Sequence, residues 1–176
     1  MEELFEVKGQ QISLTQLLNK SKPDLLSFTG GLLICCRLAP QDYHRFHFPV
    51  AGQIQESYSV SGRLDSVGPV AQSVKSQIFL KNYRQVTFCS SVEFGEFYFV
   101  EIGALTVGKI KSTHEGEEFS QGQEKGYFQF GGSTIIVVLK PKTIVVDKEC
   151  LAVSQSEKLE SFVKLGTILG KKYEPS

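Results

Sequence analysis

The sequence predicts a β-rich α+β fold, a compact antiparallel sandwich or barrel-like domain with a short N-terminal helix and a C-terminal helix. Thirteen Phe, six Tyr and no Trp, together with many Val and Ile, favour strands over a helical bundle. Sixteen glycines supply turns between short apolar runs. A length of 176 residues suits one domain with a hydrophobic core and is short for two, so we expect residues 1–176 to form a single domain.

The N-terminal third begins with a strand and a helix. Leu4–Val7 has the composition of a short strand and runs into a Lys-Gly pair. Ser13 is a good N-cap, and the apolar positions of Leu14–Leu18 share one helical face. A Gly-Gly pair then predicts a turn into a buried strand over Leu32–Cys36.

From residue 50 onward, short apolar runs alternate with turn residues, which is typical of a series of strands. Glu115–Glu124 is polar and contains glycine, so we expect a loop there. Glu157–Leu169 has apolar residues at mostly helical spacing and predicts a closing surface helix with one buried face. The expected strands are Ile54–Val60, Gln77–Leu80, Val86–Ser90, Phe97–Ile102, Val107–Lys111, Tyr127–Phe130, Thr134–Leu139 and Thr143–Val146.

Charge and cysteine content argue against several classes of function. Lysine plus arginine equals aspartate plus glutamate at 19 each, so we expect no nucleic-acid partner. The four cysteines form no CxxC pair and there are three histidines, so we expect reduced, buried thiols and no metal centre. The longest apolar stretches fall far short of the roughly 20 residues that span a bilayer, and the N-terminus lacks a signal peptide.

Two segments hold candidate catalytic residues. Arg37–Pro49 carries His44 and His47 among Arg, Asp and Tyr, which indicates either acid–base chemistry or a polar turn with hydrogen-bonded histidines. In Gly126–Ile135 a Gly-Gly pair interrupts a run of β-formers directly before Ser133. Glycine permits a strained backbone that presents a carbonyl to the next side chain, but the same residues also suit a turn or bulge between strands.

Taken in order, these segments resemble the phosphatidylserine decarboxylase family over nearly the whole chain. Arg37–Pro49 is similar to its Leu-Ala-Pro-x-Asp-Tyr-His-Arg-x-His-x-Pro signature. Gly126–Thr134 is similar to its self-cleavage motif, in the Gly-Gly-Ser-Thr form of many eukaryotic members. Phe5–Gly9, Glu93–Gly95 and Ile102–Gly108 match further blocks of the family. The resemblance identifies the chain as the catalytic core of a pyruvoyl-dependent decarboxylase.

The resemblance implies an enzyme that makes its own cofactor. Ser133 would attack the carbonyl of Gly132, and cleavage between them would leave pyruvate, as a pyruvoyl group derived from Ser133, at a new N-terminus. Residues 1–132 would become the β-chain and 133–176 the α-chain, so the two cleaved chains would be partners. The ketone would form a Schiff base with the amine of phosphatidylserine, and loss of carbon dioxide would give phosphatidylethanolamine, a step of phospholipid biosynthesis.

The resemblance also assigns roles to the histidines. His47 would be the base that deprotonates Ser133, and His44 would handle protons during decarboxylation. Asp42 is expected to be a local turn or salt-bridge residue. The family's orienting aspartate belongs to a motif upstream of the Lys-Gly block where this sequence begins, and it has no counterpart here, so we expect slow or absent processing of this chain alone.

Two alternatives stay open at this point. The chain could decarboxylate a free amino acid, or it could be a non-processing relative that acts as a lipid-binding or scaffold protein. For the leading hypothesis we expect an intracellular location on the mitochondrial inner membrane or an endomembrane, with peripheral contact to the membrane surface. Leu25–Leu33, or Phe46 and Phe48, are the candidate contacts, and a homodimer is left open.

Overall fold

The computed structural model describes residues 4–7, 10–67, 78–104, 110–129, 133–152 and 160–174, and a six-stranded sheet is its largest element. The strands of this sheet pair antiparallel throughout. Their order is β3 (Leu32–Leu38), β11 (Ser133–Leu139), β7 (Gly95–Ile102), β6 (Arg84–Ser91), β5 (Gly52–Val60) and β9 (Glu118–Phe119).

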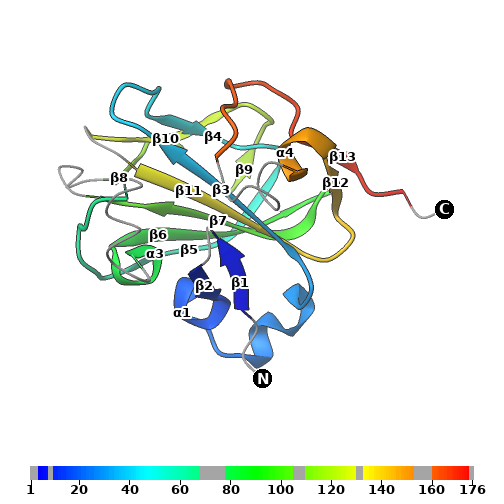
Figure 1. Cartoon of the computed structure of the whole chain (residues 1–176), viewed down its shortest axis with the longest axis horizontal. Coiled ribbons are helices and arrows are strands. Elements are labelled where there is room, and N and C mark those ends of the chain that lie inside the picture. The colour runs from blue at the N-terminus through cyan, green and yellow to red at the C-terminus, as the bar shows by residue number, and fades with distance from the viewer. Residues whose placement is uncertain are drawn as a thin grey trace.

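Smaller elements cover the six-stranded sheet (Figure 1). A three-stranded sheet has the order β4 (Arg45–His47), β10 (Glu124–Phe128) and β8 (Ile110–Ser112). Two hairpin-like pairs join β1 (Leu4–Val7) to β2 (Gln10–Ser13) and β12 (Ile144–Val146) to β13 (Gly170–Lys172). The helical elements are α1 (Leu14–Leu18), the 3₁₀ helix η1 (Pro23–Phe28), α3 (Ile78–Lys81) and α4 (Lys148–Ala152).

Two hydrophobic cores lie on opposite faces of the six-stranded sheet. The first packs α1, η1 and α3 against one face, with Leu17, Phe28 and Phe79 among its members. The second packs β4 and β10 against the other face, and it is rich in phenylalanine. Strands in the middle of the sheet are therefore buried on both sides, which explains why β7 reads as a nearly continuous apolar run rather than as an alternating one.

Local sequence explains the first helix and the entry into β3. The Ser13 side chain caps α1 by accepting a hydrogen bond from the Gln16 backbone N–H at 3.4 Å, and Asn19 ends the helix in the left-handed conformation. At Gly31 a Cβ atom would lie 2.2 Å from the carbonyl oxygen of Leu139, so only glycine lets the start of β3 approach the end of β11 this closely.

Arg84 ties the helical layer to the sheet. Its guanidinium is buried and donates hydrogen bonds to the carbonyls of Gln16 and Leu17 in α1 at 2.6 Å each. It also donates to the carbonyls of Leu80 at 3.0 Å and Asn82 at 2.9 Å. The last carbonyls of a short helix have no partner within the helix, so Arg84 satisfies groups that would otherwise be buried unpaired.

Most sequence predictions of structure are confirmed. The fold is a β-rich α+β domain of antiparallel sheets, and Leu4–Val7 and Leu14–Leu18 form β1 and α1 with the predicted bounds. The strands expected at Ile54–Val60, Val86–Ser90, Phe97–Ile102, Thr134–Leu139 and Thr143–Val146 correspond to β5, β6, β7, β11 and β12 with bounds shifted by one or two residues.

Two predicted elements are wrong. Residues 78–80 of the expected strand Gln77–Leu80 lie in α3, because the Asn82 N–H closes a helical turn on the Ile78 carbonyl and Ile78 enters the core. The helix expected over Glu157–Leu169 is absent from residues 160–169. Gly166 has a positive φ of 86° there, and the Leu169 carbonyl accepts from the Asp147 N–H, which draws the segment into the β12–β13 pairing. The C-terminal helix of this domain is α4 instead.

Smaller differences concern burial and bounds. The strand expected to be buried over Leu32–Cys36 is partly exposed, because β3 is an edge strand with β11 as its one neighbour in the sheet. The loop expected over Glu115–Glu124 contains the two-residue strand β9. Most of Val107–Lys111 and the end of Tyr127–Phe130 lie outside the described residues.

Two further sequence predictions concern the cysteines and membrane-spanning helices. The four cysteines are free thiols, of which Cys89 is fully buried and the others partly so. Burial raises the pKa of the Cys89 thiol to about 12, so it is protonated at neutral pH. Among the described residues, the helices are too short and too polar to cross a bilayer.

We predict that Arg84→Leu lowers the free energy of unfolding by about 3 kcal/mol, because four buried carbonyl oxygens lose a charged donor. The control Arg63→Leu removes an exposed guanidinium and should change stability by less than about 0.5 kcal/mol. Urea unfolding followed by circular dichroism measures both variants. Equal stabilities would show that the Arg84 hydrogen bonds have no net effect.

Candidate active site

Ser133 is the first residue of β11, which lies between β3 and β7, and it pairs with β3. It lies opposite Leu38 in the register with β3, and its side chain is fully buried at 0% exposure. Side chains alternate along a strand, so Ser133 shares a face with Ile135, Val137 and Leu139, which all pack in the phenylalanine-rich core. The candidate nucleophile is therefore placed at the end of a strand by aliphatic packing.

The hydroxyl of Ser133 has no hydrogen-bond partner among the described residues, and neither has that of Thr134, which points to the opposite face. A buried hydroxyl without a partner costs roughly 1–3 kcal/mol. Buried polar groups without partners are uncommon in folded proteins and call for an explanation, one of which is a catalytic role. Gly131 and Gly132 lie outside the described residues.

The segment with the two histidines runs through β4, which pairs antiparallel with β10. Phe46 and Phe48 point into the core, so His47 between them faces the other side of the small sheet. There its ring stacks on Tyr43 with centroids 5.8 Å apart, and its backbone lies opposite Glu124. The Nδ1 atom of His47 is buried and has no hydrogen-bond partner among the described residues.

His44 is attached to the end of β10. Its carbonyl accepts a hydrogen bond of 2.9 Å from the Phe128 N–H, at the end of β10. Ser133 follows Phe128 by five residues, and an extended chain of that length spans at most about 18 Å. Between described residues, however, no hydrogen bond joins the Ser133 hydroxyl to either imidazole.

Other sequence-predicted residues have structural positions. Asp42 closes a turn on Ala39, accepting from the Ala39 N–H at 2.7 Å while its own N–H donates to the Ala39 carbonyl, which confirms a local turn role. Phe46 and Phe48 are core residues with 2% and 1% exposure, so they are not free to contact a membrane. Leu25 and Phe28 are buried as well, because η1 packs them against the sheet.

Sequence reasoning missed an ion pair inside the phenylalanine-rich core. Lys125 of β10 donates to Glu101 of β7 at 2.5 Å, and the two side chains are 5% and 0% exposed. The Lys125 ammonium lies 5.5–6.0 Å from the ring centroids of Phe46, Phe48 and Phe99. Burial raises the pKa of the Glu101 carboxyl, and Lys125 opposes that effect. A single acid in the buried run of β7 was the signal that could have revealed it.

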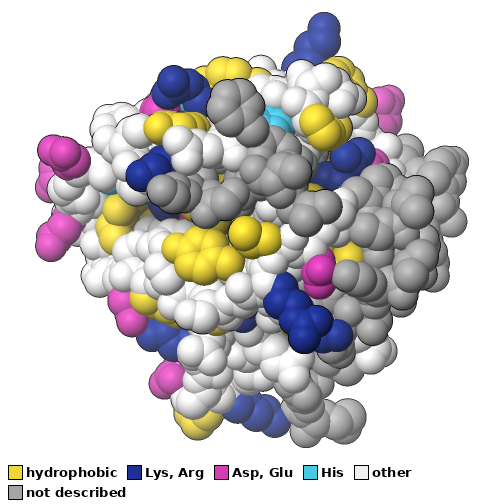
Figure 2. Space-filling model, turned by 90° about the vertical axis from the view of Figure 1, so that its left-hand side faces the viewer, with side chains coloured by type: hydrophobic (Ala, Val, Ile, Leu, Met, Phe, Trp, Pro, Cys, Tyr) yellow, Lys and Arg dark blue, Asp and Glu magenta, His cyan; other side chains and the backbone are white. Residues whose placement is uncertain are grey.

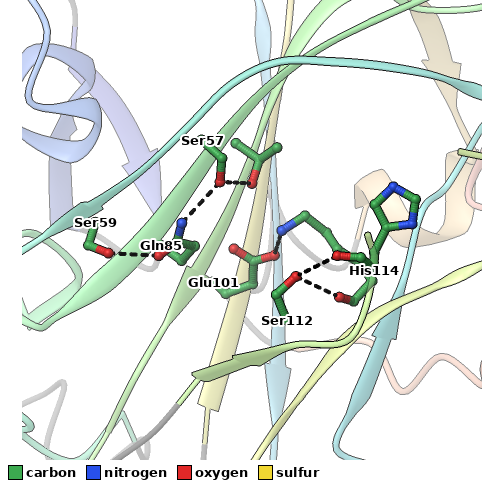
Figure 3. Close-up of polar contacts among 8 residues, drawn as sticks. Ser57, Ser59, Gln85, Glu101, Ser112 and His114 are labelled. Carbon is green, nitrogen blue, oxygen red and sulfur yellow. Dashed lines mark hydrogen bonds and ion pairs between the residues drawn. The ribbon is translucent and has the colours of Figure 1, made fainter. Parts of the chain in front are cut away.

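Glu101 belongs to a polar row that crosses the sheet. It lies opposite Ile135 of β11 on one side and Gln85 of β6 on the other, on the face that Ser133 shares. Gln85 bonds to Ser57 at 3.0 Å and to Ser59 at 2.8 Å (Figure 3). One oxygen of Glu101 has no partner among the described residues, so this row carries unused hydrogen-bonding capacity.

The surface over the start of β11 is mixed in character. Figure 2 looks onto the side of the molecule where β11 begins, and hydrophobic side chains lie in the middle of that face with both basic and acidic side chains around them.

The sequence matches a known protein family over nearly its whole length. The family model described as phosphatidylserine decarboxylase matches residues 1–171. A phosphatidylserine decarboxylase proenzyme of Chlamydia trachomatis serovar L2 is 38% identical over 172 residues, which are 97% of this chain and 56% of that protein.

Two further proteins with the same name show similar likeness. The one of Ruminiclostridium cellulolyticum is 38% identical over 170 residues, which cover 96% of this chain and 56% of that protein. The one of Clostridium perfringens strain SM101 is 39% identical over 175 residues, which cover 98% of this chain and 58% of that protein. The chain thus spans a little over half the length of the curated relatives it matches.

We predict that Lys125→Met destabilises the protein by about 3–5 kcal/mol at neutral pH, because Glu101 is left as an uncompensated buried charge. Replacing both partners, Glu101→Leu with Lys125→Met, should be nearly neutral, since apolar side chains of similar volume then fill the core. Urea unfolding of the two variants measures the difference. Equal losses of stability in the single and the double variant would show that the folded protein requires the ion pair itself.

The pH dependence of the single variant follows from the raised pKa of Glu101. A carboxyl whose folded pKa lies above its ordinary value of 4.5 binds its proton more tightly in the folded protein, so stability falls as pH rises through that window. Lys125→Met should therefore be more stable at about pH 5 than at about pH 7.5. The double variant is the control, because it lacks the carboxyl.

Proposed function

The chain belongs to the phosphatidylserine decarboxylase family, and on this premise we propose that it is the catalytic core of an enzyme that cuts itself between Gly132 and Ser133 and decarboxylates phosphatidylserine. The products of the cut are residues 1–132 and residues 133–176. The relatives are named proenzymes, which supports a processing step. The resemblance expected from the two motifs is confirmed by the family match.

One observation carries the proposal for this chain: the Ser133 hydroxyl is buried without a hydrogen-bond partner among the described residues. A structural serine at a strand end normally bonds its hydroxyl to backbone or solvent. A serine nucleophile is activated by a base within hydrogen-bond reach, and the Ser133 hydroxyl has no bond to another described residue that such a base would have to displace. The preceding residue is glycine, which places no Cβ in the path of that attack.

The proposed cleavage balances without an external reagent other than water. Deprotonated Ser133 Oγ attacks the Gly132 carbonyl carbon, the carbon–nitrogen bond breaks, and an ester replaces the amide while the Ser133 nitrogen becomes an amine. Loss of the Ser133 Cα proton then expels the Gly132 carboxylate and leaves dehydroalanine at position 133. Its imine tautomer adds water and releases ammonia, which gives a ketone at that position.

The residues at the start of β11 fit such a group. The ketone would occupy the space of a side chain that has no hydrogen bond to another described residue, opposite the apolar Leu38. Once formed, this pyruvoyl group supplies a carbonyl that condenses with the substrate amine and an adjacent carbonyl that accepts electrons as carbon dioxide leaves. Pairing with Leu38 of β3 holds position 133 in register, and the burial of its side chain excludes bulk water from it.

The two histidines have distinct proposed roles. His47 is the proposed base for Ser133, supported by the family signature and by an Nδ1 atom that has no partner among the described residues. His44 is the proposed proton carrier in decarboxylation, supported by the family signature and by its attachment to the end of β10, the strand that precedes Ser133 in the chain. The side chains of His47 and Ser133 are not hydrogen-bonded to each other in this structure, so the role of His47 requires its ring and the Ser133 hydroxyl to come within hydrogen-bond distance.

We predict that, in a chain extended by the family's upstream aspartate motif, Ser133→Ala abolishes cleavage, so that intact-mass spectrometry finds one chain where the unmutated extended protein gives two that part before residue 133. Thr134→Val is the matched control, because it removes the neighbouring buried hydroxyl at nearly constant volume and should leave cleavage intact. Two chains from Ser133→Ala would rule out the mechanism. A single uncut chain from the unmutated extended protein would instead identify a non-processing relative.

The histidine roles predict opposite defects. His47→Ala should slow the appearance of the two chains by about 100-fold or more, because Ser133 loses its base. His44→Ala should leave cleavage unchanged and lower carbon dioxide release from phosphatidylserine by about 100-fold or more. Gel analysis of newly made protein gives the first rate, and labelled substrate gives the second. Faster release from free serine than from the phospholipid would point to an amino-acid decarboxylase.

A further inference from the structure

Three large apolar side chains are exposed within seven residues of the C-terminal segment. Phe162 is 83% exposed, Leu165 71% and Ile168 75%. Single exposed apolar residues are ordinary on a protein surface, and Leu26 and Val92 are examples here. Three in one short loop are different, since clustered exposed apolar side chains mark contact with a partner or a membrane. We call residues 160–172 the C-terminal loop.

The C-terminal loop is fastened at both ends. At its start, Glu160 accepts two charge-assisted hydrogen bonds from Arg37 of β3, at 2.7 and 2.8 Å. At its end, Leu169 bonds to Asp147 and the following residues pair as β13 with β12. Between them, the Thr167 N–H closes a turn on the Lys164 carbonyl. The apolar side chains therefore project from a defined loop.

The charge of the C-terminal loop indicates which kind of surface it can bind. The C-terminal loop contains the exposed Lys164, Lys171 and Lys172 and one acid, Glu160, whose charge is paired with Arg37; the exposed Glu174 follows the loop. Apolar side chains flanked by lysines fit a bilayer with anionic headgroups, where the apolar groups enter the interface and the ammonium groups meet phosphate and carboxylate. A purely apolar protein surface would offer no partner for the ammonium groups of these lysines.

The loop is also close in the sheet to the candidate nucleophile. Its anchor Arg37 lies opposite Thr134 in the β3–β11 register, one residue from the Ser133–Leu38 pair. In Figure 1 the loop, orange to red, runs above β3 and β4 before it reaches β13. The start of the loop is therefore held beside the end of β3 that pairs with the first residues of β11.

We propose that the C-terminal loop docks the protein on bilayers that contain anionic phospholipid. This inference rests on the proposed function for its biological meaning, because it brings the site to its lipid substrate. Its physical content is independent of cleavage. Phe162, Leu165 and Ile168 supply the inserted apolar surface, and Lys164, Lys171 and Lys172 supply the attraction to the anionic headgroups.

Vesicle flotation tests the proposal. The protein is mixed with phosphatidylcholine vesicles with and without about one-third phosphatidylserine. Phe162→Ser/Leu165→Ser/Ile168→Ser should weaken binding to the anionic vesicles by about tenfold or more, and so should Lys171→Glu/Lys172→Glu. The control Val92→Ser removes an exposed apolar group elsewhere and should bind normally. Circular dichroism confirms that each variant is folded.

Several outcomes would overturn the proposal. These are an unmutated protein that ignores anionic vesicles, a triple serine variant that binds normally, or equal binding to both kinds of vesicle. A dimer of the unmutated protein that the triple variant turns into monomers would assign the loop to a second copy instead.

A parallel assay separates failure of this surface from failure of the proposed function. Decarboxylation of a soluble short-chain phosphatidylserine should be unchanged in the triple variant, and the uncleaved Ser133→Ala protein should still bind vesicles. Vesicle binding without decarboxylation would leave the surface standing and remove the enzyme. Decarboxylation of the soluble lipid without vesicle binding would do the reverse.

Discussion

The fixed register of β11 is the constraint on which the rest of this structure depends. The strand is bonded along its length to β3 and β7, and its side chains alternate between two cores on opposite faces of the sheet. A slip by one residue would exchange Ile136 and Val138 with Val137 and Leu139 and empty both cores in part. Ser133 therefore owes its position to aliphatic side chains that take no part in any chemistry.

Buried polar groups in this protein fall into two kinds. Arg84 and Asn82 sit in the helical half of the molecule and have hydrogen bonds on all sides, with Asn82 bonded to Asp65 and to Gly103. At the start of β11 the hydroxyls of Ser133 and Thr134 have none among the described residues. Satisfied groups fix the architecture, while unsatisfied ones keep a capacity for reaction at a cost in stability.

How far the sequence predicted this molecule depended on the range of the forces involved. Strand periodicity and the Ser13 cap are local, so β5, β6, β7, β11 and α1 were predictable. A four-residue apolar run such as 77–80 does not distinguish a strand from a helical turn, and pairing of β13 with β12 overrides helical spacing nearby. Of the site, the long motifs indicated Ser133, His44 and His47, whereas the Lys125–Glu101 pair depends on contacts between distant strands that no local pattern encodes.

The place of β11 in the sheet has a consequence for the molecule after the proposed cut. Both neighbours of β11, the strands β3 and β7, lie before the bond between positions 132 and 133, so the smaller product would stay hydrogen-bonded between two strands of the larger one. The two products would form one split domain, and they would separate only when it unfolds. The same interlocking means that neither fragment contains a complete core, so maturation has to follow folding and cannot precede it.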